Sequence, residues 1–279
     1  MDTNEKVYNP ERLKIIEKIK DYESKGGEYF FIDVEDDPPF STLMPDDVDY
    51  LKKKFSSKVK TLVATVIAKN FNKTFKKKYN IQVIGEENIR ELKTGAIITS
   101  NHFSRYENLC VYNAVRKADK KRKVNFVIRE GNYFMPGSIG FMLKNYYTLP
   151  LSSNMRTMIN FKKAVKELLN KKEFILVYPE QSMWWNYRKP KPFKSGAFTL
   201  AVQNNVPVVP CFVTMKEVSG CDEDGFPNQE YTIHVMKPIY PDESKSSKEN
   251  VALIMEENFR LCKEKYEEVY GIELKYETE

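Results

Sequence analysis

The sequence predicts an α/β fold, in which a mainly parallel mixed sheet is flanked by helices and preceded by an N-terminal helical segment that docks on a membrane. From residue 81 onward, short apolar runs alternate with helical patterns, and this alternation is typical of a mainly parallel sheet. Before that point, apolar residues recur at helical spacing in 10–24 and 46–78. These observations divide the chain into a helical segment, 1–79, and an α/β domain, 80–279.

The N-terminal segment contains two expected helices and an acidic connector. The first helix begins at Pro10 and ends before the glycine pair at 26–27. The connector, 33–49, holds seven acidic residues, three prolines and neither Lys nor Arg, a composition that favours a loop. The pattern in 46–78 predicts one long helix or two helices joined near 69–70.

The elements of the α/β domain follow from its apolar runs. We expect strands at 81–84, 95–100, 124–128, 146–149, 173–178, 206–213 and 230–237. We expect helices at 105–116, 135–144, 155–170 and 196–204, with a charged terminal helix near 247–270.

Composition and cysteine use exclude several classes of protein. Apolar residues make up 41% of the 279 residues and charged residues 30%, a balance too apolar for a disordered chain. No apolar run approaches the ~18 to 20 residues that span a bilayer. The four cysteines lack CxxC spacing and the N-terminus lacks a signal-peptide pattern, so we expect a reduced, cytoplasmic protein. Only His102 and His234 are present, which excludes a histidine-rich metal site, and we expect neither a metal nor a cofactor.

Basic charge is concentrated in one segment. Ten lysines and no acidic residue lie between residues 51 and 85, so the rest of the chain has a net charge of −4 although the whole carries +6. A solvated helix face, a nucleic-acid patch and a membrane-surface helix are all compatible with this run. No nucleic-acid recognition motif accompanies it, whereas lysines interleaved with apolar side chains are typical of a helix on an anionic membrane. We therefore expect peripheral contact with anionic lipids and no nucleic-acid partner.

Candidate chemistry begins at the end of an apolar strand. The strand 96–100 is followed directly by Asn101 and His102, and Glu107 lies five residues beyond the histidine. Ligands of open α/β sheets bind beyond the carboxyl ends of the strands. A carboxylate that holds one imidazole nitrogen leaves the other nitrogen able to accept a proton. The pair therefore predicts a general base, while Cys110 is interpreted as a small buried residue rather than a nucleophile.

A second polar cluster follows the expected strand 173–178. The loop 179–195 contains the carboxylate Glu180, four cations and several aromatic residues, and it ends at a helix N-terminus that can receive an anion. Each cation alone is compatible with a solvated surface charge. As a group they are candidates for substrate binding, with Arg188 and Lys194 the strongest. The aromatic residues of this loop are candidates for stacking on a sugar ring.

Four ordered blocks extend across the α/β domain. They are Asn101-His102 with Glu107, Tyr-Pro-Glu at 178–180, Phe-Lys-Ser-Gly-Ala at 193–197, and Val-Pro-Val-Val-Pro at 206–210. In this order and rough spacing they resemble the blocks of the glycerolipid acyltransferase family, also described as lysophospholipid or PlsC-like acyltransferases. The resemblance covers roughly 81–240, and its specificity comes from the ordered combination.

The resemblance implies transfer of a fatty acyl group from acyl-CoA or acyl-carrier protein to a hydroxyl of a membrane lipid. We expect this reaction at the inner, cytoplasmic face of a membrane, with the protein bound peripherally. It implies that His102 deprotonates the acceptor, that Glu107 orients His102, and that Glu180 orders the acceptor-binding loop. The resemblance and the position of each residue together give the candidate substrate-binding residues Asn101, Arg129, Glu180, Ser182, Arg188, Lys194 and Gly196. Because the base must be neutral, activity is expected to rise from acid pH.

The chain departs from the family pattern where the acceptor phosphate is held. The first-block aspartate is Glu107, the third-block arginine is replaced by Met183, and the second block at 149–152 supplies no arginine. We therefore expect an acceptor without a terminal phosphate, either a lysolipid or a glycolipid. Two alternatives stay open: a 1-acylglycerol-3-phosphate acyltransferase that binds phosphate through displaced cations, and a catalytically weak member that only binds lipid or membrane.

Overall fold

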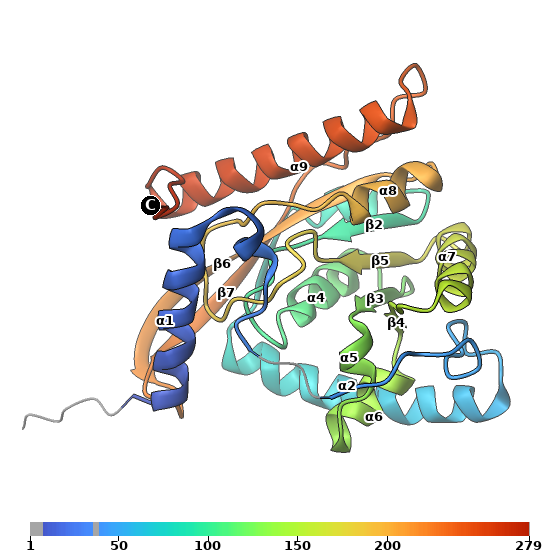
Figure 1. Cartoon of the computed structure of the whole chain (residues 1–279), viewed down its shortest axis with the longest axis horizontal. Helices are drawn as coiled ribbons and strands as arrows, with labels where there is room; N and C mark the ends of the chain where they lie inside the picture. Colours follow the sequence, from blue (N-terminus) through green and yellow to red (C-terminus); the bar gives the residue numbers. More distant parts are fainter. Residues whose placement is uncertain (1–7, 36–38, 279) are drawn as a thin grey trace, which may run out of the picture.

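A mixed sheet forms the centre of the molecule (Figure 1). The computed structural model describes residues 8–35 and 39–278, and within them seven strands pair in the order β1-β7-β6-β2-β5-β3-β4. All neighbouring strands are parallel except β6 and β7. The strands are β1 Gln82–Ile84, β2 Ala96–Thr99, β3 Val124–Ile128, β4 Thr148–Pro150, β5 Phe174–Val177, β6 Val208–Cys221 and β7 Pro227–Val235. The expected α/β fold with a mainly parallel sheet is confirmed.

Helices connect most of the strands. They are α1 Pro10–Lys25, the 3-10 helix η1 Gly27–Phe31, α2 Phe55–Lys78, α3 Glu87–Arg90, α4 Asn108–Ala118, α5 Glu130–Tyr133, α6 Gly137–Asn145, α7 Met155–Asn170, α8 Gly196–Gln203 and α9 Ser247–Tyr270. No helix in the described ranges combines the length and the apolar character that crossing a bilayer requires.

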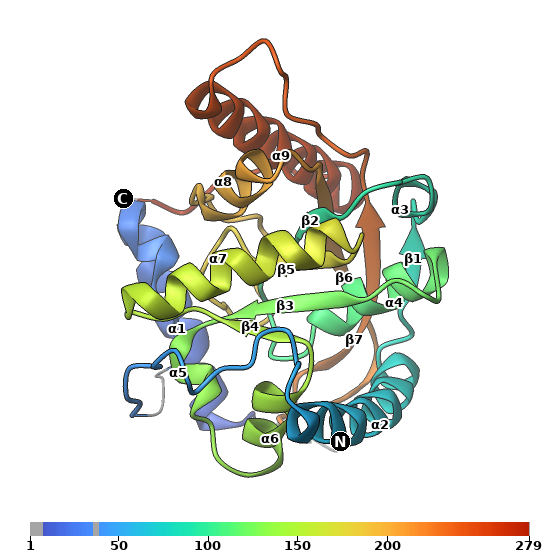
Figure 2. The same ribbon diagram turned by 90° about the vertical axis from the view of Figure 1, so that its right-hand side faces the viewer.

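Both faces of the sheet are buried. Alternate residues of each strand point to opposite sides, and other elements of the chain cover both sides. On β2, Ala96 and Ile98 belong to one core cluster, which includes residues of α4 and the end of α2. Ile97 belongs to the other cluster, which lies beneath α7, α8 and α9. Figures 1 and 2 show α9 and α2 on opposite sides of the sheet. The central strands are therefore almost continuously apolar, as parallel strands covered on two faces must be.

The helix expected at 46–78 begins later than its lysine-rich pattern indicates. α2 starts at Phe55, because the Asp49 carboxylate accepts hydrogen bonds from the backbone N–H groups of Lys53 (3.0 Å) and Lys54 (2.9 Å). Lys52 has a φ of 52°, a left-handed conformation that no α-helix continues. The predicted start at residue 46 is thus wrong, whereas α2 runs through 69–70 without a break.

The hairpin of β6 and β7 extends beyond its predicted bounds of 206–213 and 230–237. β6 continues to Cys221 and β7 begins at Pro227. The added part of β6 is largely exposed and polar, so it carries no apolar alternation that would predict a strand.

His234 makes the fold sensitive to acid. It is buried on β7, its Nε2 lies 3.0 Å from Thr214 Oγ1, and burial together with the charge of Lys265 lowers its pKa to about 4. An unfolded chain takes up this proton near pH 6.5. The stability contributed by neutral His234 is therefore complete above pH ~6.5 and is lost as the pH falls toward 4.

We expect His234→Gln, whose amide can still bond to Thr214, to lose less stability than the parent protein between pH ~6.5 and 4. Denaturant unfolding across this range measures the difference. Parallel pH profiles for the two proteins would show that His234 is not the group that takes up the proton.

Candidate active site

His102 and Glu107 form a close pair at the carboxyl end of β2. His102 Nδ1 lies 2.5 Å from Glu107 Oε1, and Glu107 directly precedes α4. The imidazole packs flat on the ring of Tyr178, with ring centroids 4.0 Å apart. The side chain of His102 is 22% exposed, whereas that of Glu107 is 1% exposed. The imidazole is thus accessible to a ligand while the carboxylate that holds it is shielded from water.

The surroundings of Glu107 favour a carboxylate that acts through His102. Among the described residues, Glu107 Oε2 and the Tyr178 hydroxyl are buried and have no hydrogen-bond partner. Burial and the nearby charge of Glu107 raise the pKa of Tyr178 well above its usual value. The same two causes raise the pKa of Cys110, so its thiol stays protonated and is a poor nucleophile.

Glu180 holds the backbone of the His102 loop. Its Oε2 accepts the backbone N–H of His102 (3.1 Å), and its Oε1 accepts the backbone N–H of Lys191 (3.0 Å). The Lys191 ammonium lies 3.9 Å from Glu180 Oε2 and donates to the carbonyl (2.7 Å) and hydroxyl (2.5 Å) of Ser182. All three side chains are buried. Glu180 therefore joins the loop after β5 to the loop after β2.

This network shows that Lys191 is not a solvated surface charge. Its side chain is 1% exposed, and burial lowers its pKa to about 7 although Glu180 opposes the shift. Burial likewise raises the pKa of Glu180, against the effect of the Lys191 charge. The ammonium also lies 4.7 Å from the centre of the Trp184 ring. One of the four cations of the loop 179–195 is therefore buried and bonded to other residues of the same loop.

Three other candidate residues make backbone contacts or lie open to solvent. Asn101 exchanges two hydrogen bonds with the backbone of Val213, at 3.0 and 2.8 Å. The buried Ser182 hydroxyl donates to the carbonyl of Phe30 (2.6 Å). Gly196 is the exposed first residue of α8, and a Cβ at this position would meet no atom within 4 Å. Their assignment to substrate binding stays a prediction.

Acidic residues of the N-terminal segment form ion pairs with two arginines of the α/β domain. Arg129, which precedes α5, forms an ion pair with Asp33, and Asp33 also accepts the backbone N–H of Met183 (2.5 Å). Arg105 forms an ion pair with Glu35. Sequence reasoning missed Arg105, although it lies inside the first block between His102 and Glu107. Burial lowers the pKa of Arg129.

The remaining candidate cations are also paired. Arg188 donates to Glu217 at 2.6 Å. Lys194 donates to Glu28 at 2.8 Å. The candidate cations therefore meet carboxylates of this chain, and an anionic substrate has to displace or share those contacts.

Trp184 is not available to stack on a sugar ring. It is 0% exposed and packs against Phe30, with ring centroids 5.5 Å apart. Its indole N–H donates to the carbonyl of Ile32 (2.9 Å). The N-terminal segment thus covers the aromatic residue that the loop composition presents as a candidate. Within 8–35 and 39–278, no group of three or more His, Cys, Asp or Glu residues could hold a metal ion.

Comparison with known proteins identifies the domain that carries the His102 pair. The family model described as Acyltransferase matches residues 80–214. This span includes His102, Glu107, Glu180 and Lys191. Residues 80–214 match the acyltransferase family. The matched span begins just before β1 and ends within β6. It therefore contains β2, which carries His102, and the whole of its neighbour β5.

Two curated acyltransferases are similar to this chain. A chloroplastic 1-acyl-sn-glycerol-3-phosphate acyltransferase of Brassica napus is 27% identical over 195 residues, which cover 69% of this chain and 52% of that protein. A chloroplastic 1-acyl-sn-glycerol-3-phosphate acyltransferase of Arabidopsis thaliana is 30% identical over 133 residues, covering 47% of this chain and 35% of that protein. The chain thus spans about half the length of the first relative and about a third of the second.

A solved acyltransferase structure has a similar fold. The crystal structure of PlsC, the 1-acyl-sn-glycerophosphate acyltransferase of Thermotoga maritima, superposes with a TM-score of 0.54 at 20% sequence identity. The match covers 81% of this chain and 87% of that chain. The α/β architecture is therefore shared beyond the matched family domain.

Proposed function

We propose that this protein transfers a fatty acyl group from an acyl thioester, either acyl-CoA or acyl-carrier protein, to a hydroxyl of a lysolipid or glycolipid. The 2.5 Å contact between His102 and Glu107 carries this proposal, because it lies at the strand ends of an acyltransferase-family domain. The partly exposed imidazole and the shielded carboxylate suit a general base held by an orienting acid.

The proposed reaction needs no covalent intermediate on the enzyme. Glu107 accepts the Nδ1–H of neutral His102, so Nε2 can take the proton of the acceptor hydroxyl. The acceptor oxygen then attacks the thioester carbonyl and forms a tetrahedral oxyanion, which polar groups nearby stabilise. Collapse breaks the carbon–sulfur bond, and the leaving thiolate takes the proton from Nε2. The products are one ester and one free thiol.

Two acceptor classes are supported by different observations. 1-Acylglycerol-3-phosphate is the first candidate, since both curated relatives are named for this acceptor. A lysolipid or glycolipid without a terminal phosphate is the second. The pairing of Arg129 with Asp33 and of Lys194 with Glu28 favours it, because a phosphate has to compete with these carboxylates for the cations.

A parallel assay separates the acceptor classes. Purified protein receives one acyl thioester with either 1-acylglycerol-3-phosphate or a neutral lysoglycolipid, and thiol release and lipid products are measured. If phosphate is held by displaced cations, Arg129→Ala should raise the KM for 1-acylglycerol-3-phosphate on the order of 10-fold, while the surface control Arg90→Ala should not. A preference for the neutral acceptor that is insensitive to Arg129→Ala supports the second class. Absence of thiol release with every donor and acceptor would support a lipid-binding protein without catalysis.

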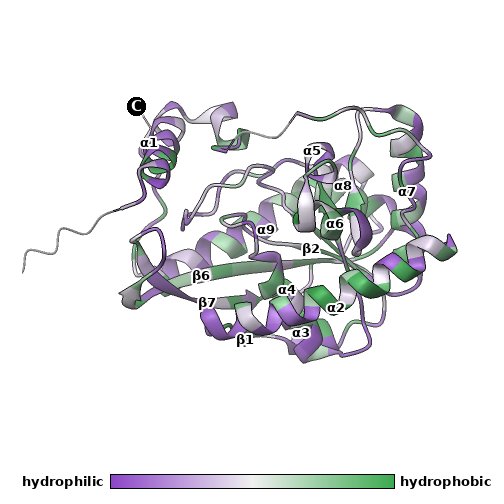
Figure 3. Cartoon of the chain, turned by 90° about the horizontal axis from the view of Figure 1, so that it is seen from below, coloured by the Kyte–Doolittle hydropathy of each residue, from purple (hydrophilic) through white to green (hydrophobic). Residues whose placement is uncertain are grey.

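We also propose that α2 rests on an anionic membrane surface, at the cytoplasmic face. Figure 3 shows hydrophobic and hydrophilic residues interleaved along this helix. Its buried residues are Thr61, Ala64 and Phe75. Its exposed apolar residues are Phe55, Val59, Leu62, Val63, Val66, Ile67 and Phe71. An apolar stripe that is not covered by the rest of the protein, with lysines beside it, is typical of an interfacial helix.

Vesicle binding tests this orientation. Phe55 is 82% exposed and Leu62 is 67% exposed, so Phe55→Ser with Leu62→Ser should leave the melting temperature unchanged. The double variant should weaken vesicle binding by at least ~10-fold, because the transfer of each large apolar side chain from water into the membrane contributes about 1.5–3 kcal/mol to the binding free energy. Leu13→Ser, on an exposed position of α1, is the matched control. Equal binding of all three proteins would assign the stripe to some other contact.

The lysines of α2 should act separately from its apolar stripe. Lys58→Glu with Lys69→Glu should weaken binding to anionic vesicles and reduce its dependence on salt, since the attraction to the leaflet is screened over a Debye length. Binding that keeps its salt dependence would assign these lysines to an ordinary solvated face.

A further inference from the structure

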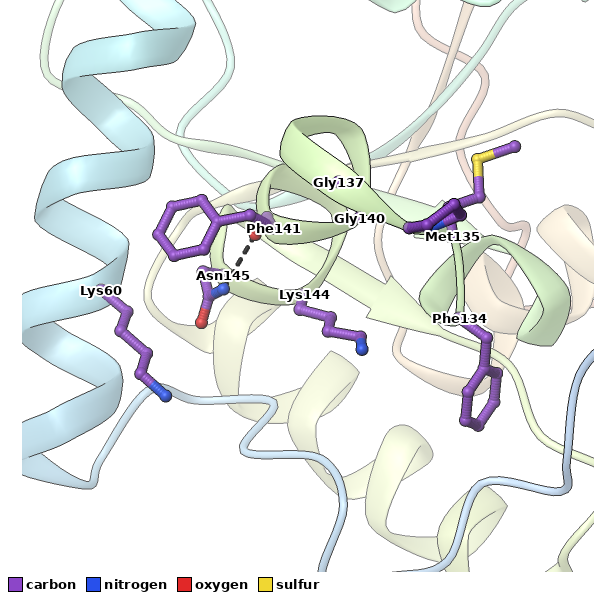
Figure 4. A pocket seen from close by; sticks show the side chains of 9 residues that line it. Lys60, Phe134, Met135, Gly137, Gly140, Phe141, Lys144 and Asn145 are labelled. Atoms are coloured by element: carbon purple, nitrogen blue, oxygen red, sulfur yellow. Dashed lines mark hydrogen bonds between the residues drawn. The ribbon is translucent and has the colours of Figure 1, made fainter.

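An open pocket of about 440 Å³ lies between α2 and α6, apart from the His102 pair. Its lining includes Lys60, Phe134, Met135, Gly140, Phe141 and Lys144. Figure 4 shows that Lys60 comes from α2 and Lys144 from α6, and that their ammonium groups point to the same side of the pocket. The pocket therefore joins the proposed membrane helix to the α/β domain.

Fixed contacts build the walls of this pocket. The hydroxyl of Thr61 on α2 donates to the carbonyl of Asn145 at the end of α6 (2.7 Å). The ammonium of Lys52 donates to the carbonyl of Lys144 (3.0 Å). A Cβ on Gly140 would lie 1.6 Å from the carbonyl oxygen of Met135, so only glycine allows this close approach. The two hydrogen bonds join α2 and the turn before it to the end of α6.

The pocket carries positive charge that no acidic residue of its lining neutralises. No Asp or Glu is among the lining residues, and in the described ranges no ion pair is found for Lys60 or Lys144. The Lys144 ammonium lies 5.9 Å from the centre of the Tyr133 ring. The carboxylate of Asp49, in the turn before α2, is engaged by backbone N–H groups. The two ammonium groups therefore remain available to an anion.

The position of the pocket indicates what kind of anion it meets. Lys60 lies about 60° around α2 from Val63, an exposed residue of the apolar stripe. On the other wall, Ile139 of α6 is 45% exposed. Phe134 and Phe141 supply apolar surface inside the pocket. A ligand that reaches the pocket from the side of the stripe has to combine an anionic group with an apolar body.

We propose that this pocket binds the phosphate headgroup of one anionic phospholipid in the membrane on which α2 rests. The inference rests on the membrane docking proposed above. Lysine ammonium groups act as point charges with three donors each, which suits a phosphate that approaches in varied orientations. The aromatic walls contact the glycerol and the upper acyl chain, which inorganic phosphate lacks. The pocket thus anchors the protein at one defined site in addition to the diffuse attraction of its lysines.

Binding of a soluble, short-chain phosphatidylglycerol tests the proposal below the concentration at which it forms micelles. The parent protein should bind it saturably, and Lys60→Gln with Lys144→Gln should weaken this binding at least ~10-fold, since two charge-assisted contacts are lost. Lys69→Gln with Lys73→Gln, which removes the same charge from α2 elsewhere, should change it less than twofold. Inorganic phosphate should bind more weakly than the lipid. Equal loss in the two double variants would overturn the proposal and leave only diffuse attraction.

The outcome is separable from the functions proposed above. Lys60 and Lys144 lie outside the His102 site, so their double variant should transfer acyl groups to a soluble acceptor at the parent rate. If the parent protein binds anionic vesicles but no soluble lipid, the pocket proposal fails while membrane docking stands. If the parent protein binds no vesicles and the Lys60 and Lys144 variant binds the soluble lipid normally, both fail.

Discussion

Replacing His102 with alanine should lower kcat/KM for acyl transfer by about 10²- to 10⁴-fold, the contribution typical of a general base. The protein should remain folded, because the side chain is partly exposed and the backbone N–H of His102 still reaches Glu180. Thiol release measures the rate and thermal denaturation measures the fold. His234→Gln, which changes the other histidine of the chain, is the matched control and should keep near-normal activity at neutral pH. Near-normal turnover by folded His102→Ala would contradict the role of His102 as general base.

Changes at Glu107 separate the contribution of its carboxylate from that of the His102 imidazole. Glu107→Gln should cost less activity than His102→Ala, because it removes the charge that orients the imidazole while the imidazole remains. Glu107→Asp shortens the side chain that lies 2.5 Å from His102 Nδ1 but keeps its negative charge. Because the charge is kept, this variant should retain more activity than Glu107→Gln. Insensitivity to both changes would remove Glu107 from the site.

Replacing Lys191 with methionine should produce the largest loss of stability. It leaves the buried carboxylate of Glu180 without its ion-pair partner, and breaking a buried pair on one side costs about 3–5 kcal/mol. Denaturant unfolding measures the free energy. The double change Lys191→Met with Glu180→Gln should recover part of the loss, since no uncompensated charge remains.

Lys194→Met provides the control for this experiment. Lys194 comes from the same loop, but its partner Glu28 is 81% exposed, and exposed pairs contribute about 0–1 kcal/mol. Lys191→Met should also lower kcat, because Glu180 accepts the backbone N–H of His102. If Lys191→Met proves no more destabilising than Lys194→Met, the buried pair does not support the site.

The sequence was sufficient for features that depend on neighbours in the chain. The continuous apolar run before His102 predicts a buried strand, and it predicts that His102 lies at the carboxyl end of that strand. The five-residue spacing to Glu107 crosses only one short loop, so local geometry brings the two side chains together. The interleaving of apolar residues and lysines in α2 is likewise a local pattern, and the exposed stripe follows its helical period.

Features that depend on distant segments required the tertiary structure. Composition presents Lys191 and Trp184 as exposed groups of a polar loop, but the packing of the N-terminal segment buries Trp184 against Phe30. The contact of Arg129 with Asp33 joins residues from separate parts of the chain. Side-chain patterns record the period of an element and the polarity of its faces, but not which remote segment covers a loop, because that choice is made by packing and charge pairing among residues far apart in sequence.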